Sequence, residues 1–206
     1  MKAPLRACCQ ALGVLLVLCI APACSAYNRS LVEPRGDFGA TPAGPSAVVQ
    51  VTAASQGSPK TRDMLWGSIP TPRADRSLAD ILAHAAREDG GMDVMLPHEA
   101  ARRLEDAGLK PTLQPAPEEL RERVRALGCT SYLTVELKQW RYNYVYFASY
   151  ATIQCRVECR RAADDGLLWE AEVLREARGI SDREVARLAL AEMFRALKKQ
   201  RSPTPP

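Results

Sequence analysis

The chain has 206 residues, with 28 Lys and Arg against 24 Asp and Glu, and a formal net charge of +4. This length is typical of one domain with flanking segments. The charges are interspersed and form no basic block or stripe, which argues against nucleic-acid binding. No apolar run approaches the roughly 20 residues that a transmembrane helix needs.

Residues 1–23 have the pattern of an export signal. Lys2 and Arg6 provide a positive start, an apolar core of ten residues follows at 11–20, and Ala21-Pro22-Ala23 forms a small-residue cleavage site. Removal of this leader lowers the net charge from +4 to +2, because two of the basic residues leave with it. The leader predicts a mature protein that works outside the cytoplasm.

Two alternatives exist for the cleavage site beside Cys24. Ala23 fits a bacterial lipobox, in which Cys24 becomes the lipidated first residue, whereas residues 21–22 depart from that pattern. Ordinary signal peptidase would instead use the small residues before Cys24 or those at 24–26, and would release the protein into the periplasm. We favour lipidation of Cys24 by palmitate-type acyl chains, because several chains give durable anchoring. Ser25 in the next position favours sorting to the outer membrane.

The mature chain divides into three predicted parts. Residues 24–46 are rich in Gly, Pro, Ser and Ala without an apolar period, which predicts a flexible tether. Residues 47–199 form the single predicted domain. Residues 200–206 carry three prolines and are predicted to be a disordered tail.

Apolar periodicity and capping residues predict the elements of the domain. Ser77 with Asp80 and Ser181 with Glu184 are typical of helix starts, and Pro117 suits the first turn of a helix. In chain order we expect a strand at 47–54, a helix from 77, a strand at 92–96, helices at 99–107 and 117–127, strands at 133–138, 151–159 and 167–173, and a helix at 181–197.

The last three predicted strands alternate apolar and polar residues, so each buries one face and exposes the other. The turn signal Asp164-Asp165-Gly166 predicts a hairpin between the second and third of them. The expected fold class is therefore α+β: a mixed, mostly antiparallel sheet with helices packed on one face and a polar opposite face.

Several segments resemble a group of bacterial envelope lipoproteins: Trp140-Arg141-Tyr142, the strand after Ser149, and the segments 98–111, 128–133 and 165–169. That group includes a meningococcal surface lipoprotein with a fold like the N-terminal domain of TolB, which is also anticodon-binding-like. It is similar in architecture to curli-secretion lipoproteins and to lipoprotein activators of penicillin-binding proteins. The resemblance implies a protein that acts through protein contacts, with no catalytic residues to carry over.

The segment 140–150 is rich in aromatic residues. Trp140, Tyr142, Tyr144 and Tyr146 alternate, and the pattern of the preceding strand predicts that they lie on the face away from the helices. There they would form a contact surface for a partner protein, a second copy of the chain or lipid headgroups. The alternative is a hairpin whose tyrosines pack on one another and on the tether.

Three cysteines remain in the domain, namely Cys129, Cys155 and Cys159. Cys155 and Cys159 lie about 13 Å apart along one strand, which is too far for a disulfide. A Cys129–Cys159 disulfide is one alternative and buried free thiols are the other. The chain has two histidines and no Cys-x-x-Cys, so we expect no metal site and no cofactor.

Motifs of known enzyme classes are absent from the sequence. The sheet-face carboxylates Glu136, Glu158, Glu170 and Glu172 are more typical of cross-strand ion pairs than of acid–base chemistry. We therefore expect a non-catalytic envelope lipoprotein, accessory to envelope assembly or secretion. Its expected partners are periplasmic or outer-membrane proteins and further copies of the same chain in a homo-oligomer. It would contact the membrane through its lipid anchor. The alternative is a small secreted periplasmic enzyme that uses these carboxylates.

Overall fold

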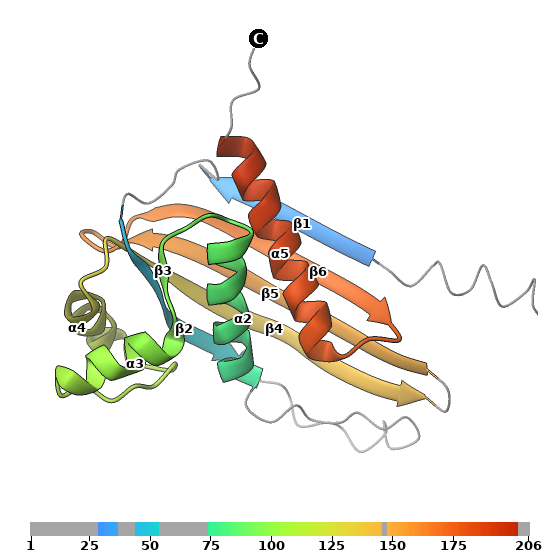
Figure 1. Cartoon of the computed structure of the whole chain (residues 1–206), viewed down its shortest axis with the longest axis horizontal. Coiled ribbons are helices and arrows are strands. Elements are labelled where there is room, and N and C mark those ends of the chain that lie inside the picture. Colours follow the sequence, from blue (N-terminus) through green and yellow to red (C-terminus); the bar gives the residue numbers. More distant parts are fainter. Residues whose placement is uncertain (1–28, 37–43, 54–73, 146–147, 202–206) are drawn as a thin grey trace, which may run out of the picture.

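The structure is a computed structural model that describes residues 29–36, 44–53, 74–145 and 148–201. These residues form a six-stranded sheet of order β1-β6-β5-β4-β2-β3 and the helices that pack against it (Figure 1). No helix among them is both long and apolar enough to span a membrane.

The sheet is mixed and mostly antiparallel, as predicted. β4, β5, β6 and β1 pair antiparallel in series, whereas β2 runs parallel to both β4 and β3. β4, β5 and β6 are consecutive in the chain, whereas β1 pairs with the edge of β6 from the other end of the sequence. The strands are β1 (Arg29–Gly36), β2 (Ser46–Ala53), β3 (Val94–Met95), β4 (Ser131–Val145), β5 (Ala148–Arg161) and β6 (Leu167–Arg178).

Two helix boundaries follow the capping residues of the sequence, whereas α2 begins at Ala74, before the start predicted at Ser77. Ser181 Oγ accepts a hydrogen bond from the Glu184 N–H at 3.2 Å at the start of the last helix. Gly128, with φ +64°, ends the helix that begins at Pro117. The helices are α2 (Ala74–Glu88), α3 (Pro97–Asp106), α4 (Pro117–Leu127) and α5 (Asp182–Arg201).

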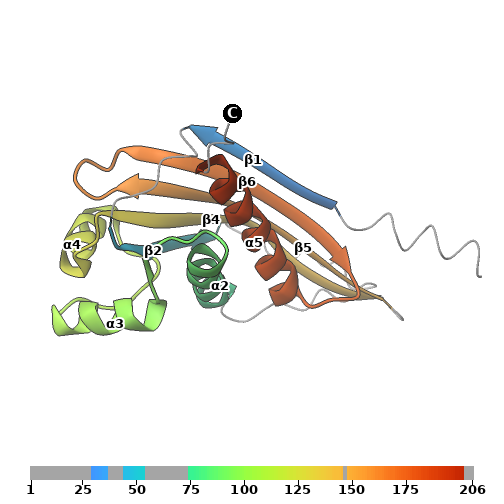
Figure 2. The same cartoon turned by 45° about the horizontal axis from the view of Figure 1, so that its top comes forward.

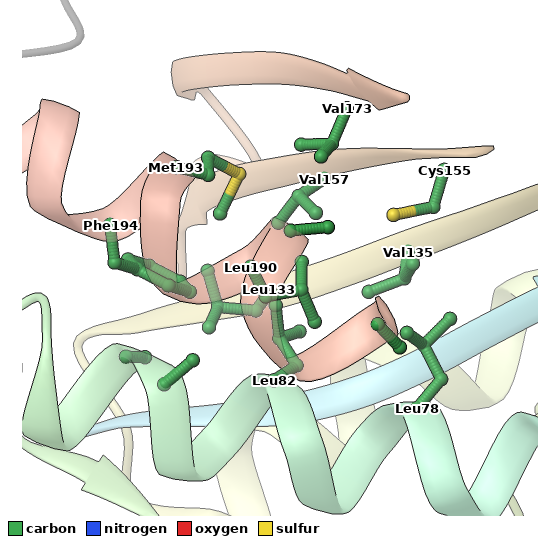
Figure 3. Packing of buried hydrophobic residues seen from close by; sticks show 14 of the residues in the cluster. Leu78, Leu82, Leu133, Val135, Cys155, Val157, Val173, Leu190, Met193 and Phe194 are labelled. Carbon is green, nitrogen blue, oxygen red and sulfur yellow. The ribbon is translucent and has the colours of Figure 1, made fainter. Parts of the chain in front are cut away.

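The main core lies between the sheet and the helices α2 and α5, which cover the same face (Figure 2). Leucines of α2 and of α5 point toward valines and Cys155 of the sheet, as Figure 3 shows. Trp169 of β6 and Phe194 of α5 meet edge to face with ring centroids 6.2 Å apart. Both are fully buried, so truncating either to Ala would cost about 3–5 kcal/mol.

A second, smaller core lies at one end of the opposite face. Successive side chains of a strand point to opposite faces. Val48 and Leu133 belong to the main core, whereas their neighbours Ala47, Val49 and Tyr132 pack with α3 and α4. The α+β class is thus confirmed, with α2 and α5 on the predicted face, whereas α3 and α4 cover one end of the opposite face, which was predicted to be polar.

The segment predicted as a tether, 24–46, contains a strand. β1 pairs with β6 along its whole length at the edge of the sheet. Val32 packs against the main core, and Ser30 Oγ donates a hydrogen bond to Glu192 Oε2 at 2.7 Å. Pro34 is compatible with this position because an edge strand has one unpaired side. Residues Arg29–Gly36, which lie within the predicted tether, are therefore part of the same sheet as the predicted domain.

Candidate functional site: the open sheet face and the aromatic hairpin

The sheet face opposite α2 and α5 carries ion-paired carboxylates. Lys138 Nζ lies 2.8 Å from Glu172 Oε2, and Gln154 Nε2 donates to Glu172 Oε1 at 2.9 Å. These hydrogen bonds, that from Lys138 foremost, lower the pKa of Glu172 below its usual value. Glu158 is held in the same way by Arg160, at 2.8 Å. The face is therefore polar but largely charge-compensated.

Like charges also lie directly opposite one another on this face. Glu158 is the register partner of Glu170, and Glu33 is that of Glu172. Directly opposed like charges destabilise a sheet unless cations lie beside them. Arg35 of β1 approaches Glu170 to 3.6 Å and offsets one such pair. The edge strand thus contributes charge as well as backbone pairing.

A shallow polar concavity of about 310 Å³ lies on the same face, over β2, β4 and β5. Its charged residues are Glu136, Arg156 and Glu158, and Arg156 lies opposite Glu136 in the strand register. Acid–base catalysis by two carboxylates requires that their environments push their pKa values apart. Here Glu136 lies opposite Arg156 and Glu158 is paired with Arg160. This arrangement is suited to polar contacts with another molecule. The remaining lining residues are Gln50, Thr52, Thr134 and Val135.

The prediction that Trp140 lies on the open face is wrong. Trp140 is 6% exposed and belongs to the main core on the helix side. Its indole N–H donates to Asp182 Oδ2, at the start of α5, at 2.8 Å. The cause is an irregularity in the β4–β5 register between Leu137 and Gln139, which reverses the alternation of β4 from that point on.

The tyrosines of the aromatic segment differ in where they lie relative to the predicted contact surface. Tyr142 is partly buried against the main core, so it follows Trp140 to the helix side. The side chain of Tyr144 and the whole of Tyr146 lie outside the described residues, and their role in a contact surface stays a prediction. Tyr150 of β5 is stacked by the Arg178 guanidinium, 4.7 Å from the ring centroid.

Of the two alternatives for the cysteines, the Cys129–Cys159 disulfide is not formed. Leu133, and not Cys129, is the register partner of Cys159. Cys159 faces the main core, whereas Cys129 packs in the second core with α3 and α4. Burial raises the pKa of the Cys129 thiol to about 11 and that of the Cys155 thiol to about 12. Cys24, the predicted lipidation site, lies outside the described residues.

The burial of Arg123 in α4 was not predicted from the sequence. Of the three arginines of α4, at positions 121, 123 and 125, Arg123 is only 2% exposed. Its guanidinium donates to the carbonyl oxygens of Thr112 and Lys110 and so holds the loop between α3 and α4. The only signal in the sequence is the spacing of two residues between these arginines, which places Arg123 on the opposite side of the helix from Arg121 and Arg125. Within the described residues, no group of His, Cys, Asp and Glu is arranged to hold a metal ion.

Comparison with solved structures supports the fold. The dodecameric PelC from Paraburkholderia phytofirmans matches with a TM-score of 0.57 at 18% identity, over 82% of this chain and 98% of that chain. Lipoprotein GNA1162 from Neisseria meningitidis matches with a TM-score of 0.46 at 14% identity, over 76% and 99% of the two chains. The LpoB C-terminal domain from Salmonella enterica matches with a TM-score of 0.41 at 13% identity, over 66% and 84%.

No protein-family model matches the chain, and no curated protein matches it in sequence. What the match to PelC shows is therefore a shared fold that covers nearly all of that protein. The α+β architecture that the sequence resemblance implied is confirmed at that level.

Proposed function

We propose that this protein is a non-catalytic, lipid-anchored envelope protein that acts through protein contacts and assembles with further copies of itself. The observation that carries the proposal is the fold shared with PelC, which is described as a dodecamer, over 98% of that chain. The leader and Cys24 of the sequence support the proposed envelope location and the proposed anchor. The ion-paired carboxylates of the open face support contact with a polar protein surface.

The start of β1 supports a position of the domain close to such an anchor. Five residue steps separate Cys24 from Arg29, so the chain between them spans at most about 18 Å. The register places Arg29 opposite Glu176, near the end of β6, where Arg178 pairs with Tyr150. The start of β1 therefore lies at the same end of the sheet as the end of β4 and the start of β5, as both Figure 1 and Figure 2 show.

This shared end is suited to a membrane interface. The sequence of the hairpin is rich in tyrosine, and its strands carry exposed Arg141 and partly exposed Tyr150 with its stacked Arg178. Tyrosine and arginine are favoured at headgroup depth, where their apolar parts and polar ends meet different surroundings. Lipidated Cys24 and the hairpin would then contact the membrane together, and the open sheet face would remain available to proteins.

Anchoring is tested by labelling cells with an alkyne-bearing palmitate and fractionating the envelope. We expect the label in the membrane fraction for the natural chain and for Cys19→Ala, a control within the leader. Cys24→Ala should lose the label and appear in the soluble periplasm. Equal amounts of soluble protein from the natural chain and from Cys24→Ala would contradict the anchor.

Assembly is tested on the detergent-solubilised lipidated chain by light scattering coupled to size-exclusion chromatography. A uniform oligomer is expected, and its molar mass gives the number of copies. A monomer at all concentrations, with the far-ultraviolet circular dichroism of the folded protein, would contradict assembly. Because the two experiments have separate readouts, anchoring and assembly can fail independently.

A further inference from the structure

A cavity of about 330 Å³ lies between α2, α3, α4 and the start of β2, away from the open face and the hairpin. Its walls are mainly apolar and include Val48, Val49, Leu104, Leu113 and Leu127. This volume is at the lower end of the range of small-molecule sites, which run from about 300 to 1,000 Å³. The loop between α3 and α4 closes one side, where the Val51 N–H donates to Leu113 O at 2.8 Å.

Arg123 lines this cavity and has a buried charge without a partner carboxylate. Its Nη1 donates to Thr112 O at 2.5 Å and its Nη2 to Lys110 O, and both acceptors are neutral carbonyls. None of the salt bridges formed among the described residues involves Arg123. A guanidinium has five N–H donors, so donors remain for an acceptor in the cavity. Burying an uncompensated charge is costly, and an anion beside it would remove much of that cost.

The rim of the cavity adds further positive character. Arg76 and His98 line it and are solvent-exposed, and Pro97 and His98 are the first residues of α3. A helix start carries a partial positive charge that favours an anion. One acidic residue, Asp80, also lines the rim and opposes this preference. The cavity therefore has mainly apolar walls and one side on which positive charges outnumber negative charges.

We propose that this cavity binds an amphiphile with one anionic head group, such as a medium-chain fatty acid. The alkyl chain lies among the valine and leucine side chains, and the carboxylate lies on the side of Arg123 and Arg76. Charge complementarity selects an anionic over a cationic amphiphile of the same length. The proposal does not depend on the proposed function, since the cavity lies apart from Cys24 and from the open face.

The test is isothermal titration of the mature chain carrying Cys24→Ser with decanoate and with decyltrimethylammonium. We expect one decanoate per chain and at least tenfold weaker binding of the cationic amphiphile. Ala101→Phe, at a partly exposed lining position on α3, should weaken decanoate binding at least tenfold by filling the cavity. Ala107→Phe, exposed just beyond the same helix and outside the cavity lining, is the matched control and should bind normally.

Three results would overturn the proposal. They are no binding of decanoate, equal binding of both amphiphiles, or unchanged binding by Ala101→Phe while its circular dichroism shows a folded protein. A competing occupant is the apolar stretch Met64-Leu65-Trp66 of the same chain. If decanoate bound only after Leu65 and Trp66 were changed to Ser, the cavity would be a docking site for that stretch, and the proposal would be wrong.

Discussion

Trp140 offers a direct test of how the sheet is built, because the sequence and the structure place it on opposite faces. The structure buries its indole against α5 and gives its N–H to the Asp182 carboxylate at 2.8 Å. Trp140→Phe removes the N–H and part of the ring. We expect it to lower the free energy of unfolding of the isolated protein, in which no partner is present. A tryptophan on an exposed contact surface would instead affect binding and leave folding almost unchanged.

The size of the destabilisation follows from two effects of Trp140→Phe, the lost hydrogen bond and the smaller ring. A hydrogen bond to a charged group contributes about 1.5–3 kcal/mol. We take the lower end because Asp182 is only partly buried and its Oδ1 also accepts from the Arg183 N–H at 2.9 Å. The smaller ring leaves unfilled space that adds roughly 1 kcal/mol. The expected loss for Trp140→Phe is therefore about 2.5 kcal/mol in the free energy of unfolding.

The assay is urea unfolding followed by circular dichroism, in a double-mutant cycle with Asp182→Ala. We expect a coupling energy of about 1.5 kcal/mol, because the hydrogen bond can be lost only once. The m value, which is the slope of the unfolding free energy against urea concentration, should be the same for all variants. Differences in the unfolding midpoint then report differences in stability. A change below about 0.5 kcal/mol without coupling would refute the burial of Trp140 and restore it to the open face.

Three further predictions concern other sites. Because hydrogen bonds from Lys138 and Gln154 lower the pKa of Glu172, its carboxylate stabilises the fold above the ordinary carboxyl pKa, and this contribution disappears as the pH falls through the lowered pKa. Glu172→Gln should therefore be less stable than the natural chain at neutral pH, by up to about 1 kcal/mol, with a difference that vanishes in acid; a pH-independent difference in urea midpoint would contradict this. Burial raises the thiol pKa values of Cys129 and Cys155 to about 11 and about 12, so iodoacetamide at pH 8 should label them only in urea, as read by peptide mass spectrometry; rapid labelling of the folded chain would show that they are accessible. Gly128 has φ +64° and open space at its Cβ, so Gly128→Ala should cost only the backbone strain of about 1 kcal/mol, and a much larger loss in thermal unfolding would indicate a clash instead.

Local periodicity was sufficient for most of the fold. The helix 117–127 has the predicted bounds because its start and end are both set by local residues, Pro117 and Gly128. The pattern at 29–36 could not predict β1, since Gly and Pro in the segment are typical of a linker. What makes this segment a strand is its pairing with β6, which is distant in the sequence. Edge pairing of this kind is a tertiary effect that composition does not report.

The candidate site was predictable only in part. The carboxylates of the open face were expected to pair across strands, and Glu172 does so with Lys138. The face of Trp140 was predicted wrongly because strict alternation was continued through a register shift that has no local signature. The burial of Arg123 depends on carbonyl groups of the loop before its helix, and the cavity beside it depends on how three helices pack.

The position of β1 also bears on which envelope role suits the protein. A domain that activates a periplasmic enzyme as a monomer needs a long tether to reach its partner, and a tether at 24–46 would have supplied one. With β1 beginning at Arg29, the remaining connection to a lipidated Cys24 spans no more than about 18 Å, so the domain would stay beside the membrane. Partners available there are membrane-bound proteins and further copies anchored in the same way. Confinement to one plane with a common orientation favours contacts between such copies, because each is already aligned for the next. The short connection therefore supports the proposed assembly more than a proposal of a long-reaching activator.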